Sequence, residues 1–427
     1  MRIAPTTTAG RITTLAAAVT ATAVILAVIP GHRGWFDVGV YYGTVHHWQQ
    51  TGAIYDYLRP GTVYGFTYPP FAAFCMLPML LLGWHPAVAV SVALSTVATA
   101  LLLYWTVDPI ARRQGWNRWY AFGLSACLCA LLNPVRDTVS FGQVNLLLVA
   151  LVLADWKLAQ GRWSRYAGIG IGLAAAFKLT PALFIGYLLL TRRRAAGVAL
   201  LVAAAATAVG HLAAPRESGA FWTRALWDTD RVGAFGYISN QSLQGGIARL
   251  GPELPGRTIW LASSLVVLAV WAYRVRLAHR AGDRLAGYAL TGTACCLVSP
   301  ITWVHHLVWL LPALVILADA GLRSPQRARR RRLLTAFWAA QVVLCSGVVW
   351  LWWNVPGHGI GVLLGGNAYL LIALALLVAM PIRGRTGEPE EPAGAASAGE
   401  AVDEAAGAGR GAAPLAEPEP VGAPARH

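Results

Sequence analysis

The sequence predicts an all-α polytopic membrane protein, because it is too apolar and too poor in charge for a soluble domain. Hydrophobic residues make up 56% of the 427 positions and charged residues only 12%, whereas soluble domains average roughly 25% charged residues. Apolar runs recur along the chain at or somewhat below the roughly 20 residues that a helix needs to cross the hydrocarbon core. Since a helix satisfies its own backbone hydrogen bonds in lipid, we expect a bundle of roughly 10 to 13 transmembrane or re-entrant helices.

The formal net charge of +15 follows the pattern of membrane topology and does not indicate a nucleic-acid partner. Basic residues gather in short segments at 162–165, 192–194, 274–284 and 323–332, whereas 383–427 is acidic. Short loops rich in Lys and Arg stay in the cytoplasm. We therefore expect these segments on the cytoplasmic side of a multi-pass plasma-membrane protein that is surrounded by membrane lipids. No feature of the sequence indicates an oligomeric state.

The chain begins with a short N-terminus at 1–11, which is followed by an apolar segment at 12–30. We interpret 12–30 as the first membrane helix, since it ends in Val-Ile-Pro-Gly without an A-x-A-like cleavage site. An uncleaved signal anchor is the alternative. With Arg11 on the cytoplasmic side, 31–68 becomes a long first external loop.

Later segments are placed by working backward from a cytoplasmic C-terminus. The expected spans lie near 366–382, 333–353, 303–320, 285–300, 258–273 and 196–213. This map makes 215–256 a second external loop. Residues 12–382 would form one membrane domain. The stretch 383–427, which is rich in Ala, Gly, Pro and Glu, would form a disordered cytoplasmic tail.

Two parts of this map depart from simple spans. The apolar segment 167–190 contains Phe-Lys-Leu-Thr-Pro and has basic flanks, which predicts two half-helices that meet at the break. The segments 119–133 and 145–158 likewise flank a polar turn. The segments 69–83 and 87–107 cannot both be full spans if Arg112 is cytoplasmic, so the sequence leaves this part of the topology open.

Asp37 is the candidate catalytic base, because it follows the first helix directly, where a carboxylate can stay ionised near water and accept a proton from a hydroxyl. Its alternative role is a helix cap or a salt bridge with Arg33. His46 and His47 beside Trp48 are more typical of interfacial residues. The pattern Asp228-Thr229-Asp230 matches D-x-D, but solvated acids in a polar loop explain it better than a metal site.

Lys178 is the candidate phosphate ligand, since an ammonium in an apolar, Ala-rich and Leu-rich segment is costly and indicates function. Snorkelling to the interface is the alternative. Arg59 and Arg136 are candidates to clamp the same anion, because guanidinium groups bind such oxygens bidentately. An ion pair with Asp137 explains Arg136 equally well.

The remaining candidates are polar residues that the map places near the same external end. His305 and His306 would donate to a leaving phosphate or orient a sugar hydroxyl, or else form an interfacial pair. As adjacent residues they are not both expected to face the cavity. The further substrate-binding candidates are Tyr41, Gln143, Asn145, Asn240 and Gln241.

Several of these motifs together carry a resemblance to a known family. In chain order they are WFD at 35–37, YGFTYPPF at 64–71, FGQVN at 141–145, KLTP at 178–181, NQS at 240–242, and SP at 299–300 followed by two histidines. Their joint order resembles the actinobacterial polyprenyl-phosphate-mannose-dependent α-mannosyltransferases of glycosyltransferase family 87, in the GT-C superfamily. The YGFTYPPF stretch looks most like the α-(1→2)-mannosyltransferases of lipomannan and lipoarabinomannan.

The resemblance implies a GT-C type bundle and an inverting enzyme whose site faces the periplasm. The implied donor is polyprenyl-phosphate-mannose, and the implied acceptor is a mannosylated glycolipid or lipoglycan. Asp37 would be the general base, while Lys178 and one residue of the His305/His306 pair would meet the donor phosphate. Neither a metal nor a further cofactor is expected, because the lipid-linked sugar is itself the co-substrate.

Two alternatives stay open at this point. The transferred sugar could be another one, such as arabinofuranose or glucose, because no residue pattern fixes its identity. A lipid-linked-sugar flippase would also have interrupted helices and intramembrane cations. It would not need a carboxylate in a long external loop, and it would more naturally show repeated halves.

Overall fold

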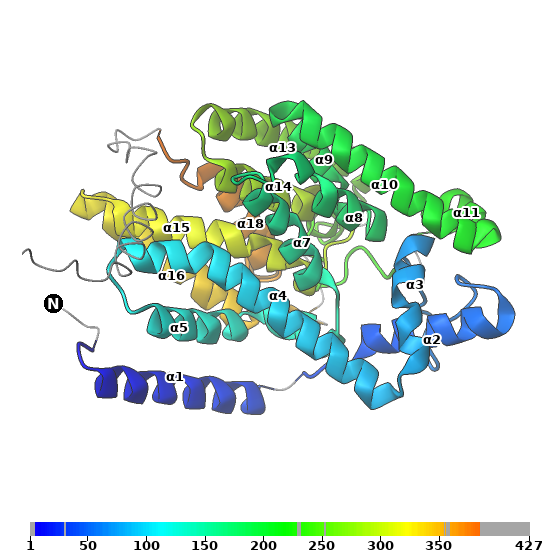
Figure 1. The fold of residues 1–427 in the computed structure, drawn as a ribbon, viewed down its shortest axis with the longest axis horizontal. Coiled ribbons are helices and arrows are strands. Elements are labelled where there is room, and N and C mark those ends of the chain that lie inside the picture. Colours follow the sequence, from blue (N-terminus) through cyan, green and yellow to red (C-terminus); the bar gives the residue numbers. More distant parts are fainter. Residues whose placement is uncertain are drawn as a thin grey trace, which may run out of the picture. The chain divides into compact units, whose positions relative to one another are not determined.

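The computed structural model describes residues 5–29, 31–228, 232–251, 253–353, 355 and 359–384, and these residues are helical with connecting loops (Figure 1). They contain no strand, and a single-residue bridge pairs Leu58 with Gly65. The predicted tail at 383–427 lies, beyond residue 384, outside the described residues.

The helices of ten or more residues are α1 (Thr8–Val28), α2 (Phe36–Thr51), α4 (Trp84–Arg113), α5 (Arg118–Leu131), α7 (Asn145–Leu158), α10 (Arg193–Ala213), α13 (Gly256–Arg280), α14 (Arg284–Val298), α15 (Leu311–Arg323), α16 (Arg327–Ser346) and α18 (Ala368–Ala379). The shorter α-helices are α3 (Pro70–Met76), α6 (Asn133–Phe141), α8 (Ile169–Phe177), α9 (Leu183–Thr191), α11 (Pro215–Ala220), α12 (Leu243–Ala248) and α17 (Ile360–Leu364). The short helical segments are η1 (Leu77–Leu81), η2 (Ser164–Tyr166), η3 (Thr180–Ala182), η4 (Phe221–Ala225), η5 (Val304–Leu310) and η6 (Val348–Trp352).

Five of these helices are long and apolar enough to cross a membrane: α1, α4, α10, α13 and the continuous η5–α15 segment. The helices α6 and α7 pass the same test as a pair, but they are bent by 113° at their junction. Shorter apolar helices lie at Pro70–Leu81, Thr180–Thr191, Arg284–Val298 and Ala368–Ala379. The chain is therefore an all-α polytopic membrane protein, as the composition predicts. How many segments span the bilayer stays a prediction.

Three segments show how the structure refines the predicted spans. The break predicted within 167–190 is confirmed, because α8 ends at Phe177 and Lys178 is extended. The region 69–107, whose topology the sequence leaves open, forms a short helical stretch at Pro70–Leu81 and the 30-residue helix α4. The span expected at 333–353 is divided, because Gly347 adopts a φ of +68° and ends α16.

Helix α14 forms the centre of the core. Its residues from Leu285 to Leu297 are all buried, and it packs against α7, α9, α13, α15 and α18. Small residues let these helices approach closely. A Cβ added to Gly287 would lie 2.6 Å from the Tyr187 ring. Trp271 also donates a hydrogen bond from Nε1 to Thr291 Oγ1 at 3.0 Å, so α13 is fixed to the same helix.

The long helix α4 connects two ends of the bundle that carry different chemistry. Near its start, Ser91 Oγ donates to the carbonyl of Gly142 at 3.4 Å. At its end, Arg113 pairs with Asp319, which also binds Arg323 at 3.1 Å and Arg383 at 3.0 Å. Ser91 and Arg113 are about 33 Å apart along the helix axis, at 1.5 Å per residue. That distance is close to the roughly 30 Å of the hydrocarbon core.

Candidate active site

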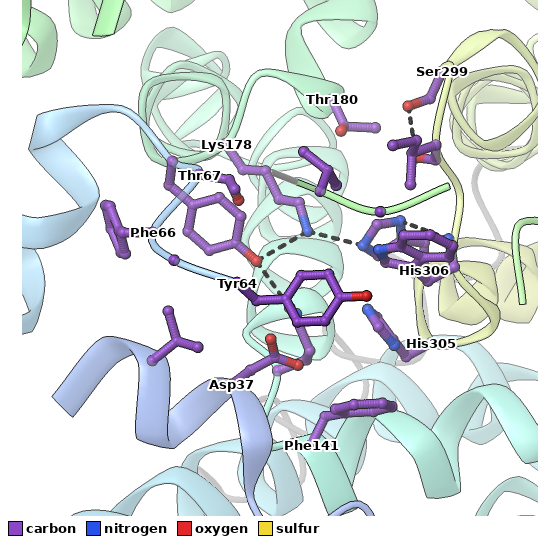
Figure 2. A pocket seen from close by; sticks show the side chains of 18 of the residues that line it. Asp37, Tyr64, Phe66, Thr67, Phe141, Lys178, Thr180, Ser299, His305 and His306 are labelled. Atoms are coloured by element: carbon purple, nitrogen blue, oxygen red, sulfur yellow. Dashed lines mark hydrogen bonds between the residues drawn. The ribbon is translucent and has the colours of Figure 1, made fainter. Parts of the chain in front are cut away.

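A cavity of about 510 Å³ lies at the Ser91 end of α4, where several helices begin, end or break. Its wall is formed by the start of α2, by 64–69, by the α6–α7 junction, by the α8–η3 break and by η5. Figure 2 shows Asp37 at the bottom of this cavity, Lys178 at the top and the two histidines at the right. Segments far apart in sequence thus bring a carboxylate, an ammonium and two imidazoles to one space.

The start of α2 is held in an unusual backbone conformation. Trp35 has a φ of +54°, the one positive φ of a non-glycine residue in the described part of the chain. For a bulky residue this is a strained conformation that the surroundings must enforce. Its N–H donates to Ser140 O at 3.0 Å, and the Arg59 guanidinium donates to the carbonyl of Phe36 while lying 4.4 Å from the centre of that ring. These contacts fix the first turn of α2, and with it Asp37.

The α6–α7 junction brings a second polar segment against α2. Gly142 has a φ of +71°, and a Cβ at this position would lie 2.0 Å from Val38 Cγ2, so only glycine fits here. The next residue, Gln143, is buried and accepts a hydrogen bond from the Tyr68 hydroxyl at 3.0 Å. Asn145 begins α7 and donates to the carbonyl of His305 at 3.3 Å. The junction therefore carries two amides into the site.

Lys178 is buried and surrounded by neutral partners. Its Nζ donates to Asn145 Oδ1 at 3.0 Å and to Tyr68 Oη at 3.3 Å, and it lies 3.2 Å from His306 Nε2. Throughout the described ranges, no carboxylate forms an ion pair with this ammonium. Asp37 lines the same cavity and acts on this ammonium only through space, and a buried charge without a paired counter-charge is costly. The arrangement is therefore suited to receive an anion from outside the protein.

The two histidines both line the cavity, so the expectation that only one would face it is wrong. They lie on the tight 3₁₀ helix η5, and their ring centres are 4.6 Å apart. Neighbouring side chains on such a helix, with three residues per turn, point about 120° apart, so the cavity extends along more than one face of η5. His306 Nδ1 accepts from the Trp303 N–H at 3.2 Å, which directs Nε2 toward Lys178. Both ring nitrogens of His305 are buried and have no hydrogen-bond partner among the described residues.

The electrostatics of Asp37 match the work of a base near neutral pH. Burial raises the pKa of this carboxyl from 3.8 to about 6, because the ionised form loses hydration. A hydrogen bond from Gln143 and the positive charges of Lys178 and Arg59 oppose the increase. Its Oδ2 has no partner in the described structure. Arg33 pairs with Asp137 at 3.4 Å, so the salt bridge considered for Asp37 is not formed.

Of the residues selected from the sequence, six line this cavity. They are Asp37, Tyr41, Gln143, Lys178, His305 and His306. Asn145 lies just behind the wall and contacts it through Lys178. Asp228, from the D-x-D pattern, is also in the wall, whereas Thr229 and Asp230 lie outside the described residues.

Four further candidates lie outside the wall and hold backbone segments in place. Arg59 binds the start of α2, and Arg136 donates to Cys345 O at 2.9 Å instead of pairing with Asp137. Asn240 donates to Pro300 O at 3.1 Å, and Gln241 to Gly366 O at 2.8 Å. Direct contacts of these four with a substrate stay predictions.

Tyr68 and Arg33 are among the residues of the site that the sequence-based selection does not include. Tyr68 is a hub, since its hydroxyl lies within hydrogen-bond distance of Tyr41, Gln143 and Lys178. Arg33 lies over the ring of Trp350, 4.4 Å from its centre, and lines the cavity. The Tyr-Pro-Pro after the polar loop is a local signal for Tyr68. The partner of Arg33 is more than a hundred positions away in sequence, so no local pattern reveals it.

In the described ranges, no three His, Cys, Asp or Glu side chains lie close enough together to bind a metal ion. That the reaction needs no metal stays a prediction. The groups that are present can accept a proton at Asp37 and can stabilise an anion at Lys178 and the histidines. A carboxylate and a cation across one cavity suit the displacement of an anionic leaving group by a hydroxyl.

Comparison with known proteins gives one consistent result. Residues 66–300 match the model of glycosyltransferase family 87. The chain is 32% identical over 372 residues to a polyprenol-phosphate-mannose-dependent alpha-(1-2)-phosphatidylinositol mannoside mannosyltransferase of Mycobacterium tuberculosis. The aligned region covers 82% of each of the two chains. The protein of the same name from Mycolicibacterium smegmatis is 33% identical, over 84% of both chains.

A second group of relatives has a related name. The polyprenol-phosphate-mannose-dependent alpha-(1-2)-phosphatidylinositol pentamannoside mannosyltransferase of Mycolicibacterium smegmatis is 34% identical, over 76% of this chain and 78% of its own. No solved structure shows a significant match to the chain.

Proposed function

The chain belongs to glycosyltransferase family 87 and transfers mannose from polyprenol-phosphate-mannose, and we propose that it does so with inversion, with Asp37 as general base. The proposed product is an α-(1→2)-mannoside on a phosphatidylinositol mannoside or a related lipoglycan. The acceptor and the linkage are taken from the names of the relatives. The observation that carries the proposal is the placement of Asp37 across one cavity from Lys178 and His305.

The proposed reaction is a direct displacement at C1 of the donor mannose. Asp37 takes the proton of the acceptor hydroxyl as its oxygen forms the new bond to C1. The bond from C1 to the phosphate oxygen breaks, and its electron pair leaves with polyprenyl phosphate. Lys178 and His305 stabilise the negative charge that grows on that phosphate. Attack from the face opposite the leaving group converts a β-linked donor into an α-linked product.

The apolar part of the wall suits the lipid portion of the donor. It is formed by Phe66, Leu179, Phe221 and Leu226. We place the first isoprene units there, because their burial is favourable while the phosphate stays beside Lys178. The polar acceptor then approaches Asp37 from another part of the wall.

The proposed orientation puts the cavity on the extracytoplasmic side. The support is the basic cluster around Asp319, where Arg113, Arg323 and Arg383 gather at the far end of α4. Positive charge marks the cytoplasmic side of membrane proteins. A thiol reagent that does not cross membranes tests this: a cysteine at Val63, in an exposed loop near the cavity, should react in intact cells. Labelling only after cell lysis would contradict the orientation.

Transfer of labelled mannose tests the proposed function directly. The purified protein, reconstituted in vesicles, receives polyprenyl-phosphate-mannose and phosphatidylinositol mannoside. We expect an α-(1→2)-linked product, whose anomeric configuration is read from the C1–H1 coupling in NMR spectra. Movement of the lipid-linked sugar across the bilayer without transfer would instead favour a flippase. Preferential transfer of another sugar would contradict mannose as the sugar of the donor.

The pH dependence of transfer provides a second test. The base must be ionised, and its pKa of about 6 lies above its ordinary value. We therefore expect kcat/KM for the acceptor to be constant well above pH 6 and to fall about tenfold per pH unit well below it. Stopped assays between pH 4.5 and pH 8, in buffers of constant ionic strength, measure the profile. A profile without any decrease down to pH 4.5 contradicts a base with this pKa.

A further inference from the structure

The cavity has a second feature that the proposed chemistry at Lys178 does not use, which is a ring of aromatic side chains in its wall. Its six members are Phe36, Tyr64, Phe141, Tyr237, Trp303 and Trp350. We call this set the aromatic collar. All six rings line the cavity and retain some exposure, with Tyr64 at 39% and Tyr237 at 38%. Large aromatic rings left exposed in a cavity that also holds charged groups indicate a ligand surface.

Contacts between neighbours make the aromatic collar continuous. Phe36 lies next to Asp37, and its ring centre is 5.8 Å from that of Tyr64 and 6.4 Å from that of Phe141. Arg33 connects Phe141 to Trp350, at 5.7 Å and 4.4 Å from the two ring centres. One end of the collar is thus adjacent to the proposed base.

The remaining contacts close the collar. Tyr237 is 6.3 Å from Trp350 and 5.9 Å from Trp303, measured between ring centres. Gly233 lies between Trp303 and Tyr64, since a Cβ added at this position would lie 3.3 Å from the first ring and 3.7 Å from the second. The six rings, with Arg33 and Gly233 between two pairs of them, therefore line one part of the cavity.

Two members of this part of the wall, Trp350 and Arg33, are held in place by hydrogen bonds. Trp350 donates from Nε1 to Asn133 Oδ1 at 3.0 Å. Arg33 is fixed by Asp137, to which it donates two of the five N–H groups of its guanidinium. Rings that are already in place lose little conformational entropy on binding.

We propose that the aromatic collar binds the sugar units of the acceptor beyond the one that reacts. One face of a pyranose ring presents C–H groups with partial positive charge, which suit the negative face of an aromatic ring, while its hydroxyls stay in contact with water. The N–H groups of Arg33 that do not face Asp137 are available to these hydroxyls. The inference rests on the proposed function, because it assigns this acceptor to a reaction at Asp37.

The geometry also separates this site from that of the donor. The reacting sugar would lie at Phe36 beside Asp37, and the next units would extend over Trp350 and Tyr237. An isoprenoid chain fits this region poorly, because the Arg33–Asp137 ion pair borders it. An acceptor with several sugars should therefore be preferred to one with a single sugar.

Octyl α-mannosides that carry one or three mannose units are suitable acceptors for the test, with polyprenyl-phosphate-mannose as donor. We expect Tyr237→Ala to lower kcat/KM for the trimannoside about five- to tenfold, which corresponds to one lost aromatic contact. The value for the monomannoside should stay within about twofold of wild type, and KM for the donor should not change.

Two control variants make the result specific. Tyr237→Phe keeps the ring and should behave as wild type. Trp353→Ala removes a ring that touches Tyr237 at 6.3 Å but does not line the cavity, and it should also keep the preference. An unchanged trimannoside value, an equal loss with both mannosides, or a higher KM for the donor in Tyr237→Ala would each overturn the assignment.

A failure of the proposed function would be recognised separately, because wild type would then transfer mannose to neither mannoside. The collar is in that case tested by binding alone. Tryptophan fluorescence measures the affinity of the trimannoside for wild type and for Tyr237→Ala in the absence of donor. A difference of about five- to tenfold supports the collar, and equal affinity overturns it.

Discussion

Asp37→Asn is expected to reduce mannose transfer by about 10² to 10⁴-fold, because the variant loses its general base. Asn has nearly the same size and can still bond with Gln143, so the wall of the cavity should keep its shape. Only the ability to accept the proton disappears. Single-turnover transfer of labelled mannose in reconstituted vesicles measures this loss without interference from product release.

Asp228→Asn is the matched control for this prediction, since it makes the same substitution in the wall of the same cavity. It should transfer mannose at a rate within about threefold of wild type if its carboxylate takes no part in proton transfer. Full activity of Asp37→Asn would remove this residue as the base. A large loss in Asp228→Asn alone would move the catalytic carboxylate to the D-x-D pattern.

Lys178→Met has the second-largest expected effect. Met keeps the unbranched stem but cannot stabilise the leaving phosphate, so kcat/KM for the donor should fall about 10² to 10³-fold. KM for the acceptor should change far less, because the acceptor meets Asp37 on another part of the wall. Initial rates measured at varied donor and varied acceptor concentrations separate the two constants.

The other lysine of the chain is a natural control. Lys157 lies near the end of α7, with Nζ 5.1 Å from the centre of the Trp156 ring, and it does not line the cavity. Lys157→Met should keep wild-type kinetics. If Lys178→Met raised KM for the acceptor more than KM for the donor, this lysine would have to be reassigned to the acceptor.

The charged members of the site can be predicted from the sequence because of their surroundings. Asp37 and Lys178 are ionisable groups beside or within apolar segments, where charge is costly and marks function. The Thr-Pro after Lys178 also predicts the helix break that places it in the cavity. Composition and the spacing of apolar runs in the same way predict the all-α membrane fold.

Contacts between distant segments are what the sequence does not reveal. Arg136 and Asp137 are adjacent, yet Asp137 pairs with Arg33 and Arg136 binds the carbonyl of Cys345. In the sequence, Tyr68 is one of many aromatic residues. Only the fold shows that its hydroxyl accepts a hydrogen bond from Lys178.

The placement of segments in the fold sets the remaining differences. His305 and His306 both line the cavity because the fold places η5 in its wall, a tertiary placement that two adjacent residues do not specify. The division of 69–107 into a short stretch and the long α4 likewise depends on tertiary packing.

The position of the donor phosphate is the most direct test of the proposed site. A structure of the protein with bound polyprenyl-phosphate-mannose, determined by electron cryomicroscopy, measures it. We predict the phosphate within hydrogen-bond reach of Lys178 Nζ and a ring nitrogen of His305, with C1 of mannose between it and Asp37. A phosphate bound at Arg136 or Arg59, with the space between Lys178 and Asp37 left empty, would contradict the proposed site.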